Sequence, residues 1–330
     1  MELAHLTRRS GDATTGLETI GAEATRVAAD VLGSRVESDA QILKAVRHRS
    51  VVIRLRLRSE TRRTVVAKLC DAAQAEREQL VYERVLPRLG VSAPMLFGAR
   101  VVGDGRAWLV LEDAGDFAWS PRFPEHRALA AEWFGTAHLA AEALVEEVAL
   151  PDRGAGYYRE MLDAARALSL DATRNRALSP ESALALRRFA GLCTSLESRW
   201  DVVEGLLLRL PTTLTLPGFC RKNARVRPSA SGTELLPLDF ENAGWGPPAT
   251  DLQHVDAARY CAQVGPSWAV RTENVLLAGV VGSALVSMKS VPGERSALLG
   301  EWPERAARKV VYYAESLERA LLAIEGTGAP

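Results

Sequence analysis

The sequence has few cysteines, no net charge and no long uninterrupted apolar run. Its 4 cysteines are widely separated and form no CxxC pair, which argues against a disulfide framework or a zinc site. Its 41 basic and 41 acidic residues balance, so no broad nucleic-acid-binding surface is expected. Without an apolar span or an apolar secretory signal, neither membrane insertion nor export is expected. These absences predict a reduced, cytoplasmic protein.

The periodicity of the chain changes along its length. The first third shows strand periodicity with one helix, and the remainder is mostly helical except for one hairpin. At 330 residues, with 47% hydrophobic and 25% charged residues, the chain can bury one large core or two ordinary ones. The pattern predicts an α+β protein with a small β-rich part and a larger helical part.

The chemically most informative stretch is 211–252. It contains a turn closed by Asn223, a polar hairpin, the apolar run LLPL, and Asp239 where that run ends. Amide and carboxylate oxygens on the two arms of one hairpin suit a hard cation such as Mg²⁺, which usually accompanies nucleotide phosphates. A lone Asn and Asp are more often a turn residue and a helix cap, so this interpretation depends on the rest of the chain.

A second hairpin and a helix precede this stretch. Residues 51–57 and 64–70 both alternate in the manner of half-buried strands, and Lys68 faces away from the apolar set. A strand lysine is usually a solvated edge residue. In the next helix, however, Glu78 lies on the same face as Ala75, and a carboxylate there needs a nearby cation. We therefore expect Lys68 to contact Glu78.

Together these segments resemble the aminoglycoside phosphotransferase and choline kinase-like family, relatives of the protein kinases. That family reads HGDxxxxN, then a short hairpin and an apolar strand ending in Asp, with a further Asp downstream. Here the motif positions are 216–223, LPGFCRKN; Asn223 matches the Asn, Asp239 the metal-loop Asp and Asp251 the later Asp. Leu-Pro-Gly replaces His-Gly-Asp, so Gly218 stands where the catalytic Asp is usual.

The resemblance implies a bilobal protein-kinase-like fold. Residues 1–114 would form the N-lobe on the nucleotide side, and 115–330 the helical C-lobe that carries the hairpin at 211–252. ATP or another nucleotide and Mg²⁺ are the implied cofactors, with Asn223 and Asp239 as metal ligands. The implied partner is a small-molecule or peptide substrate, with no nucleic acid and no membrane.

Further roles follow from the same resemblance. The residues implied at the nucleotide are Lys68, Glu78, Ser50, Glu112, Asp113 and Ala114. Lys68 would reach the α- and β-phosphates, and the last three would form a hinge whose backbone pairs with adenine. The phosphate-covering loop has no glycine, so Ser50, or the side chains of Arg47 and Arg49, would contact phosphate there.

Other matching positions carry weaker implications. Arg221 and Lys222 are candidate contacts for the transferred phosphate, but neither is a plausible base at neutral pH. Asp251 and His138 are expected to be structural. General-base help is typically worth about 10²–10⁴-fold, so its loss at Gly218 would weaken transfer without preventing it. Glu241 is a candidate replacement base because of its proximity to Asp239.

Three functions remain open at this point. The first is a diverged phosphotransferase acting on a hydroxyl of a small molecule or on a peptide Ser/Thr, in natural-product metabolism or resistance. The second is a pseudokinase that binds a nucleotide or ligand without transfer and acts on a partner protein. The third is a kinase fold reused for other chemistry or for ligand binding. Retention of Lys68, Glu78, Asn223 and Asp239 favours the first two, whereas loss of the HGD residues favours the last two.

Overall fold

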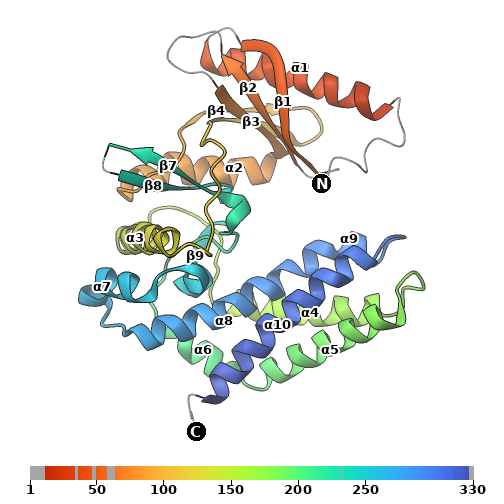
Figure 1. Ribbon diagram of the computed structural model, residues 1–330, viewed down its shortest axis with the longest axis vertical. Coiled ribbons are helices and arrows are strands. Elements are labelled where there is room, and N and C mark those ends of the chain that lie inside the picture. The colour runs from red at the N-terminus through yellow and green to blue at the C-terminus, as the bar shows by residue number, and fades with distance from the viewer. Residues whose placement is uncertain (1–11, 34–35, 47–49, 58–63, 231, 327–330) are drawn as a thin grey trace.

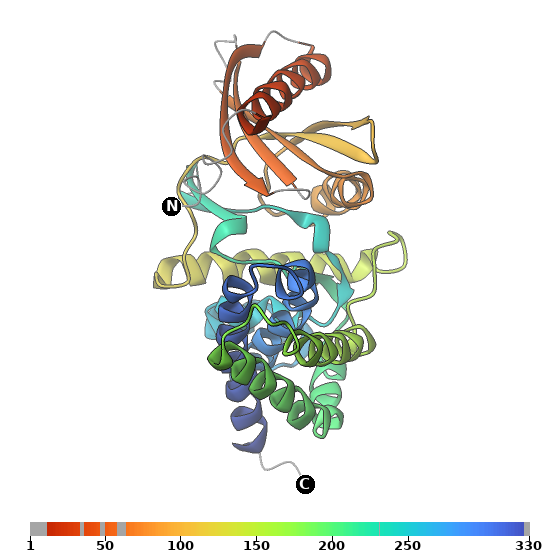
Figure 2. The ribbon, with the colours of Figure 1, turned by 90° about the vertical axis from the view of Figure 1, so that its right-hand side faces the viewer.

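The protein has two lobes (Figures 1 and 2). The computed structural model describes residues 12–33, 36–46, 50–57, 64–230 and 232–326. The lobe at the top of Figure 1 is built mainly from strands, and the larger lobe below it is mainly helical. This is the bilobal α+β arrangement that the sequence predicts; the division of the chain at residue 114 stays a prediction.

The N-terminal lobe is a five-stranded antiparallel sheet with strand order β1-β2-β3-β5-β4 and a helix on either side (Figure 2). Its elements are α1 (Asp12–Leu32), β1 (Val36–Val46), β2 (Ser50–Leu57), β3 (Thr64–Asp71), α2 (Ala72–Leu80), β4 (Leu96–Val102) and β5 (Arg106–Glu112). A π-helical turn, Val81–Val85, and a 3-10 turn, Leu86–Arg88, continue α2.

Alternation along the strands separates the two faces of this sheet. Ile53 of β2 and Val65 of β3 are fully buried and belong to one apolar cluster with Ala28 of α1. Because successive side chains of a strand point to opposite faces, Arg54 and Lys68 lie on the other face, toward the C-terminal lobe. The sequence alternation therefore places the basic side chains in the cleft between the lobes.

The C-terminal lobe contains most of the helices and four short strands. The helices are α3 (Pro124–Ala141), α4 (Ala155–Ala172), α5 (Pro180–Glu197), α6 (Trp200–Leu208), α7 (Ala257–Trp268), α8 (Thr272–Ser290), α9 (Arg295–Leu298) and α10 (Glu304–Gly326). The strands are β6 (Thr213–Thr215), β7 (Ala224–Ser229), β8 (Gly232–Pro237) and β9 (Gly244–Gly246). Local signals set helix starts: the hydroxyl of Ser179 caps α5 by accepting from the Ser182 N–H at 3.2 Å, and Pro180 follows at the first helical position.

Helix α8 lies at the centre of the C-terminal lobe. The stretch Thr272–Leu298 is long and apolar enough to cross a membrane, yet 56% of its apolar window is buried inside the protein, where α8 packs against α4 and α10. Gly279 and Gly282 allow its close approach to the segment after Asp239. A Cβ at position 282 would lie 1.9 Å from the carbonyl oxygen of Ala249. Packing within the lobe accounts for the apolar character of this helix.

Two short strand pairs position the loops between the lobes. β7 and β8 form an antiparallel hairpin, and β6 pairs with β9. The segment that follows β5 is tied to the hairpin, because the Trp119 N–H donates to the carbonyl of Ala224 at 3.1 Å. The Leu238 N–H donates to the carbonyl of Asn223 at 2.8 Å. Asn223 and Asp239, at the two ends of the hairpin, are thereby held close together.

Candidate active site

Lys68 and Glu78 form a buried ion pair beneath the N-lobe sheet. Lys68 projects from the cleft face of β3, and Glu78 lies on the buried face of α2. The Lys68 Nζ is 2.6 Å from the Glu78 Oε2, and Glu78 is fully buried. The two side chains are brought together as the sequence predicts.

Asp239 reaches the same lysine from the C-terminal lobe. It follows β8 and adopts a left-handed backbone conformation, with φ 67° and ψ 61°, which aspartate tolerates better than most residues. Its Oδ1 accepts a hydrogen bond from the Lys68 ammonium. Glu241, in the 3-10 turn Phe240–Asn242, places its Oε2 3.5 Å from the same nitrogen. Lys68 therefore contacts one carboxylate of its own lobe, that of Glu78, and two of the C-terminal lobe, those of Asp239 and Glu241.

Three carboxylates surround this one ammonium. Glu78, Asp239 and Glu241 each present an oxygen within 4.8 Å of the others. Carboxylate oxygens are the ligands that Mg²⁺ prefers, and the set carries an excess of negative charge. Glu241 belongs to this cluster, so its carboxylate lies on the metal side of the cleft; the sequence had suggested it only as a replacement base.

The electrostatics of the cluster follow from burial and proximity. Burial acts against the charge of Lys68, yet its pKa is raised because Glu78, Asp239 and Glu241 lie around it. Burial raises the pKa of Glu78, with Asp239 and Glu241 adding to the effect and Lys68 opposing it. Burial also disfavours the charge of Asp239, but Lys68, with help from Lys44, holds the pKa of Asp239 below its ordinary value. Asp239 therefore stays ionised to a lower pH than an ordinary aspartate does.

The loop at 216–223 lies next to this cluster. The Asn223 Nδ2 donates to the Gly218 carbonyl at 3.0 Å, which leaves the Asn223 Oδ1 as the oxygen that could hold a metal ion. Gly218 and Asp239 both line a small cavity of ≈ 10 Å³. Arg221 and Lys222 are exposed, and neither makes an ion pair within the described part of the chain. Their contact with a phosphate stays a prediction.

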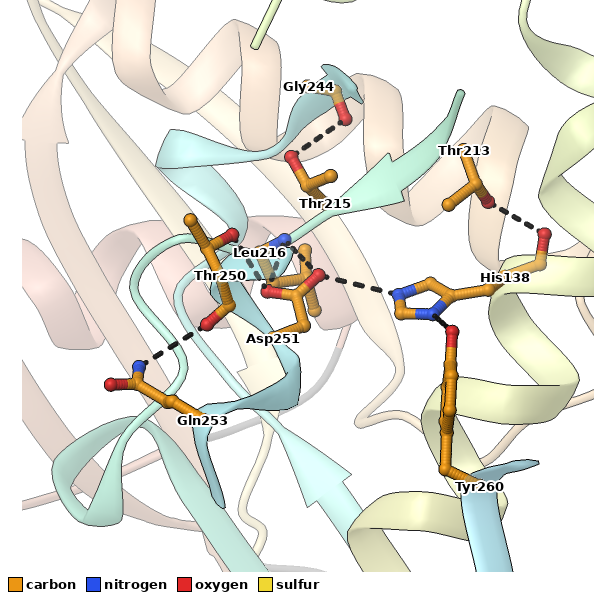
Figure 3. A network of polar contacts seen from close by, with 9 residues as sticks. All are labelled: His138, Thr213, Thr215, Leu216, Gly244, Thr250, Asp251, Gln253 and Tyr260. Carbon is orange, nitrogen blue, oxygen red and sulfur yellow. Dashed lines mark hydrogen bonds and ion pairs between the residues drawn. The ribbon is translucent and has the colours of Figure 1, made fainter. Parts of the chain in front are cut away.

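Asp251 fastens the start of this loop to the core (Figure 3). Both of its carboxylate oxygens lie 3.0 Å from the Leu216 N–H, which donates to them. His138 connects Asp251 to Tyr260: its Nε2 is 3.4 Å from the Asp251 Oδ2, and its Nδ1 is 2.8 Å from the tyrosine hydroxyl. All three side chains are buried. The network holds the backbone at the start of the 216–223 loop.

The hinge residues make side-chain contacts that sequence reasoning did not foresee. Glu112 is 2.6 Å from Arg227, and Asp113 is 2.6 Å from Arg54 on β2. Ala114 is buried, and no hydrogen bond of its backbone is found among the described residues. The pairing of this backbone with a nucleobase stays a prediction.

The phosphate-covering turn is described in part. Ser50 begins β2 and pairs in register with Val46 of β1. Arg47 and Arg49 lie outside the described residues, as does the tip of this turn. The role of Ser50 in phosphate binding stays a prediction.

Lys289, near the end of α8, is half-buried, and no local sequence signal marks it. Burial and the charge of Arg153 lower the pKa of Lys289 to about 8, although Glu241 and Asp239 oppose the shift. Arg153 is held nearby, since its Nε donates to the Asn242 carbonyl at 3.3 Å. Lys289 has no hydrogen bond or ion pair to any described residue.

Replacing Lys289 with methionine is expected to stabilise the protein by about 1–3 kcal/mol at pH 7, because a charge that desolvation disfavours is removed. The folded-state pKa lies below the ordinary value of 10.5, so the unfolded state binds more protons between about pH 8 and 10.5. Wild-type stability should therefore rise with pH in that window, and this rise should be missing in Lys289→Met. Urea unfolding at pH 7, 8.5 and 10 measures both effects, with the exposed Lys222→Met as control. Equal pH slopes for wild type and Lys289→Met would contradict the assignment.

The comparisons with known proteins find similar structures but no matching family model or curated sequence. No family model matches the chain, and no curated protein sequence matches it significantly. A putative aminoglycoside phosphotransferase from Ralstonia eutropha superposes with a TM-score of 0.60 at 13% identity, covering 95% of this chain and 98% of that one. A choline kinase from Cryptosporidium parvum gives 0.56 at 8% identity, covering 88% and 89%. A spectinomycin phosphotransferase, in complex with ADP and spectinomycin, gives 0.54 at 11%, covering 87% and 95%.

These likenesses extend over nearly the whole length of the chain. They show that the protein has the fold of aminoglycoside phosphotransferases and choline kinases, as the sequence motifs predict. At such low identity they establish the fold alone, and function must be argued from the site.

Proposed function

We propose that the protein is a diverged phosphotransferase that binds a Mg²⁺–nucleotide between its lobes and transfers a phosphoryl group to a hydroxyl of a small molecule or a peptide. The observation that carries this proposal is the contact of Lys68 with both Glu78 and Asp239. A scaffold protein has no physical need to bury an ammonium among three carboxylates, because desolvation of such groups is costly.

In the proposed reaction, one set of residues holds the phosphates of the nucleotide and another holds Mg²⁺. Lys68 offers an ammonium to the nucleotide's phosphates, and Glu78 holds that ammonium in place. Asp239, Glu241 and the Asn223 Oδ1 offer oxygens to Mg²⁺, which when bound would neutralise charge on the transferred group. The surplus negative charge of the cluster fits such an ion. The phosphotransferase that shares this fold and was solved with ADP supports a nucleotide in the cleft.

The usual side chain that would activate the acceptor hydroxyl is missing from the 216–223 loop. Gly218 has no side chain, and Glu241 is engaged with Lys68. We therefore expect slow transfer that depends mainly on positioning and charge neutralisation. The proposed substrates and Mg²⁺–nucleotide belong to the cytoplasm, where we place the protein.

A pseudokinase is the second candidate, and Gly218 is the observation that favours it. In that case the cleft would bind Mg²⁺–nucleotide without turnover, and the bound state would be read by a partner protein. Release of ADP in the presence of an acceptor distinguishes the two functions.

Mg²⁺–ATP is expected to stabilise the wild-type protein, by about 2.7 kcal/mol at 100 times its dissociation constant. Asp239→Asn should remove the Mg²⁺-dependent part of this stabilisation, because it removes a carboxylate charge from the proposed metal site. Thermal unfolding with ATP or ADP, with and without Mg²⁺, measures it. Asp30→Asn, an exposed change on α1, serves as control. Absence of any shift at millimolar nucleotide would refute nucleotide binding.

A further inference from the structure

Helix α8 packs antiparallel to a segment of the C-terminal lobe, and Lys289 lies on the face that contacts it. Gly279 lies against the end of the segment 249–252, and Gly282 lies against its start. Lys289 follows Gly282 by two helical turns, so it is on the same face and about 10 Å further along the helix axis. Over that distance the facing chain runs back toward residues 241–246. Lys289 therefore lies at the level of this part of the chain.

Arg153, just before α4, is fixed against the same part of the chain. Its backbone N–H donates to the Trp245 carbonyl at 2.7 Å, and its Nε donates to the Asn242 carbonyl at 3.3 Å. The central carbon of its guanidinium is 4.3 Å from the centre of the Tyr157 ring. These contacts orient the guanidinium but use only one of its nitrogens. The N–H groups of the two terminal nitrogens have no hydrogen-bond partner among the described residues.

The two cations are close enough to repel each other. Burial and then the charge of Arg153 lower the pKa of Lys289. Glu241 and Asp239 act in the opposite direction, but both already contact Lys68. Neither of the two cations forms an ion pair within the described part of the chain. Like charges held together in this way cost stability, and proteins commonly accept such a cost at binding sites.

Both cations are accessible to a ligand. Arg153 and Lys289 are half-buried, and the fully buried polar side-chain atoms that lack a partner in the described chain belong to other residues, so both charged groups keep contact with solvent. Two arginines of α4 itself provide a contrast. Arg159 and Arg166 both contact the carboxylate of Glu197. An arginine without such a partner, next to a lysine without one, is available to an external anion.

Arg153 is one hydrogen bond away from the cavity beside the 216–223 loop. Asn242, whose carbonyl accepts from Arg153, lines that cavity together with Gly218. Gly218 is the position at which the side chain that activates the acceptor is usual. The cation pair belongs to the C-terminal lobe, whereas Lys68, the proposed contact of the nucleotide's phosphates, belongs to the N-terminal lobe. An anion held by the pair is therefore best assigned to the acceptor.

We propose that Arg153 and Lys289 bind a carboxylate or phosphate group of the acceptor and so place its hydroxyl beside the 216–223 loop. This inference rests on the proposed function and specifies the substrate class: a hydroxyl compound that also carries an anionic group, not a neutral or cationic one. A guanidinium and an ammonium together suit such a group, because both give charge-assisted hydrogen bonds. The bound anion also removes the repulsion between the two cations.

Labelling with pyridoxal 5′-phosphate tests the anion site without knowledge of the acceptor. Its aldehyde condenses with a lysine amine to an imine with loss of water, and borohydride reduces the imine to an amine that peptide mass spectrometry locates. Pyridoxal, which has the aldehyde but no phosphate, is the matched reagent. In the full chain at pH 8, Lys289 should react about tenfold faster with the phosphate reagent. Lys309 of α10, which is exposed and paired with Glu294, should show little preference.

Competing anions and two variants identify the cause of this preference. Inorganic phosphate and glycerate should protect Lys289, and glycerol, which matches glycerate but is neutral, should not. Arg153→Gln should reduce the preference for the phosphate reagent to that of Lys309. Arg159→Gln is the matched control, because it removes an arginine that already has an acidic partner, and it should keep the preference. Absence of the preference in the wild type, or an unchanged preference in Arg153→Gln, would overturn the inference.

Mg²⁺–ATP separates this site from the nucleotide site. It should raise the thermal midpoint of the protein and leave the labelling of Lys289 unchanged. Protection of Lys289 by Mg²⁺–ATP would assign the cation pair to the nucleotide and overturn the inference. A thermal shift without any anion effect at Lys289 would also overturn it, while the proposed function would stand. Absence of a thermal shift would overturn the proposed function, and with it the assignment of the anion to an acceptor.

Discussion

Replacing Gly218 with aspartate is expected to raise the rate of phosphoryl transfer by about 10²–10⁴-fold. The substitution supplies a carboxylate at the position where the wild-type loop has no side chain. A carboxylate there can orient the acceptor hydroxyl and take its proton, the one function that the described residues of the cleft do not provide.

The backbone at Gly218 is compatible with this change. A Cβ built on it would meet only the Asn223 Nδ2, at 3.7 Å, which is an ordinary contact, and its φ is outside the left-handed region. The position also lines the small cavity that Asp239 lines. A new carboxylate would therefore lie beside the metal loop and close to an amide that can donate to it, without strain in the chain.

The rate is measured as ADP released from Mg²⁺–ATP, first with water as acceptor and then with a set of small-molecule alcohols as candidate acceptors. Gly218→Asn is the matched control, because it has nearly the same size and polarity but no basic carboxylate. Equal rates in the Asp and Asn variants would contradict the argument. A wild-type rate that is already high and does not change in Gly218→Asp would show that another group serves as base.

Short-range features of this site could be predicted from the sequence because they depend on periodicity. Alternation along β3 puts Lys68 on the cleft face, and helical spacing puts Glu78 on the buried face of the next element. The two residues are 10 positions apart, and α2 begins directly after β3, so few arrangements keep them apart. The motif spacing likewise placed Asn223 and Asp239 at the two ends of one hairpin.

Long-range pairing and strand irregularity could not be predicted in this way. Arg54 and Asp113 are 59 residues apart, and either charge alone looks like a solvated surface residue. The register shift between Ile42 and Lys44 of β1 has no glycine or proline to signal it. Lys289 lies in the last turn of an apolar helix whose partners become clear only when the helices are packed. The positions of these residues depend on tertiary contacts, which periodicity and motif spacing do not show.

Removing the central cation is expected to have the largest effect on stability. Lys68→Met should lower the free energy of unfolding by about 3–5 kcal/mol at pH 7, because it leaves buried carboxylates without their partner. Only 9% of the Lys68 side chain is exposed, so water cannot replace the lost ammonium well. Chemical denaturation of wild type and variant, without divalent ions, measures the loss.

The pH dependence of this loss has a definite sign. In the wild type the pKa of Asp239 is held low by Lys68, so its contribution is present above its ordinary pKa and disappears as pH falls. Without Lys68 the carboxylates repel one another and their folded-state pKa values rise. The folded variant then binds more protons than the unfolded chain, and its stability falls as pH rises from about 5 to 8. The deficit should therefore be small at pH 5 and largest at pH 8.

The same variant separates a metal site from a simple salt-bridge cluster. Glu78, Asp239 and Glu241 can each present an oxygen within 4.8 Å of the others, so a divalent cation can replace the lost ammonium. Added Mg²⁺ or Mn²⁺ should restore stability to Lys68→Met far more than to the double variant Lys68→Met/Asp239→Asn. Restoration by metal that does not depend on Asp239 would place the ion elsewhere. A stability deficit that no divalent ion reduces would mean that the three carboxylates serve only to hold Lys68.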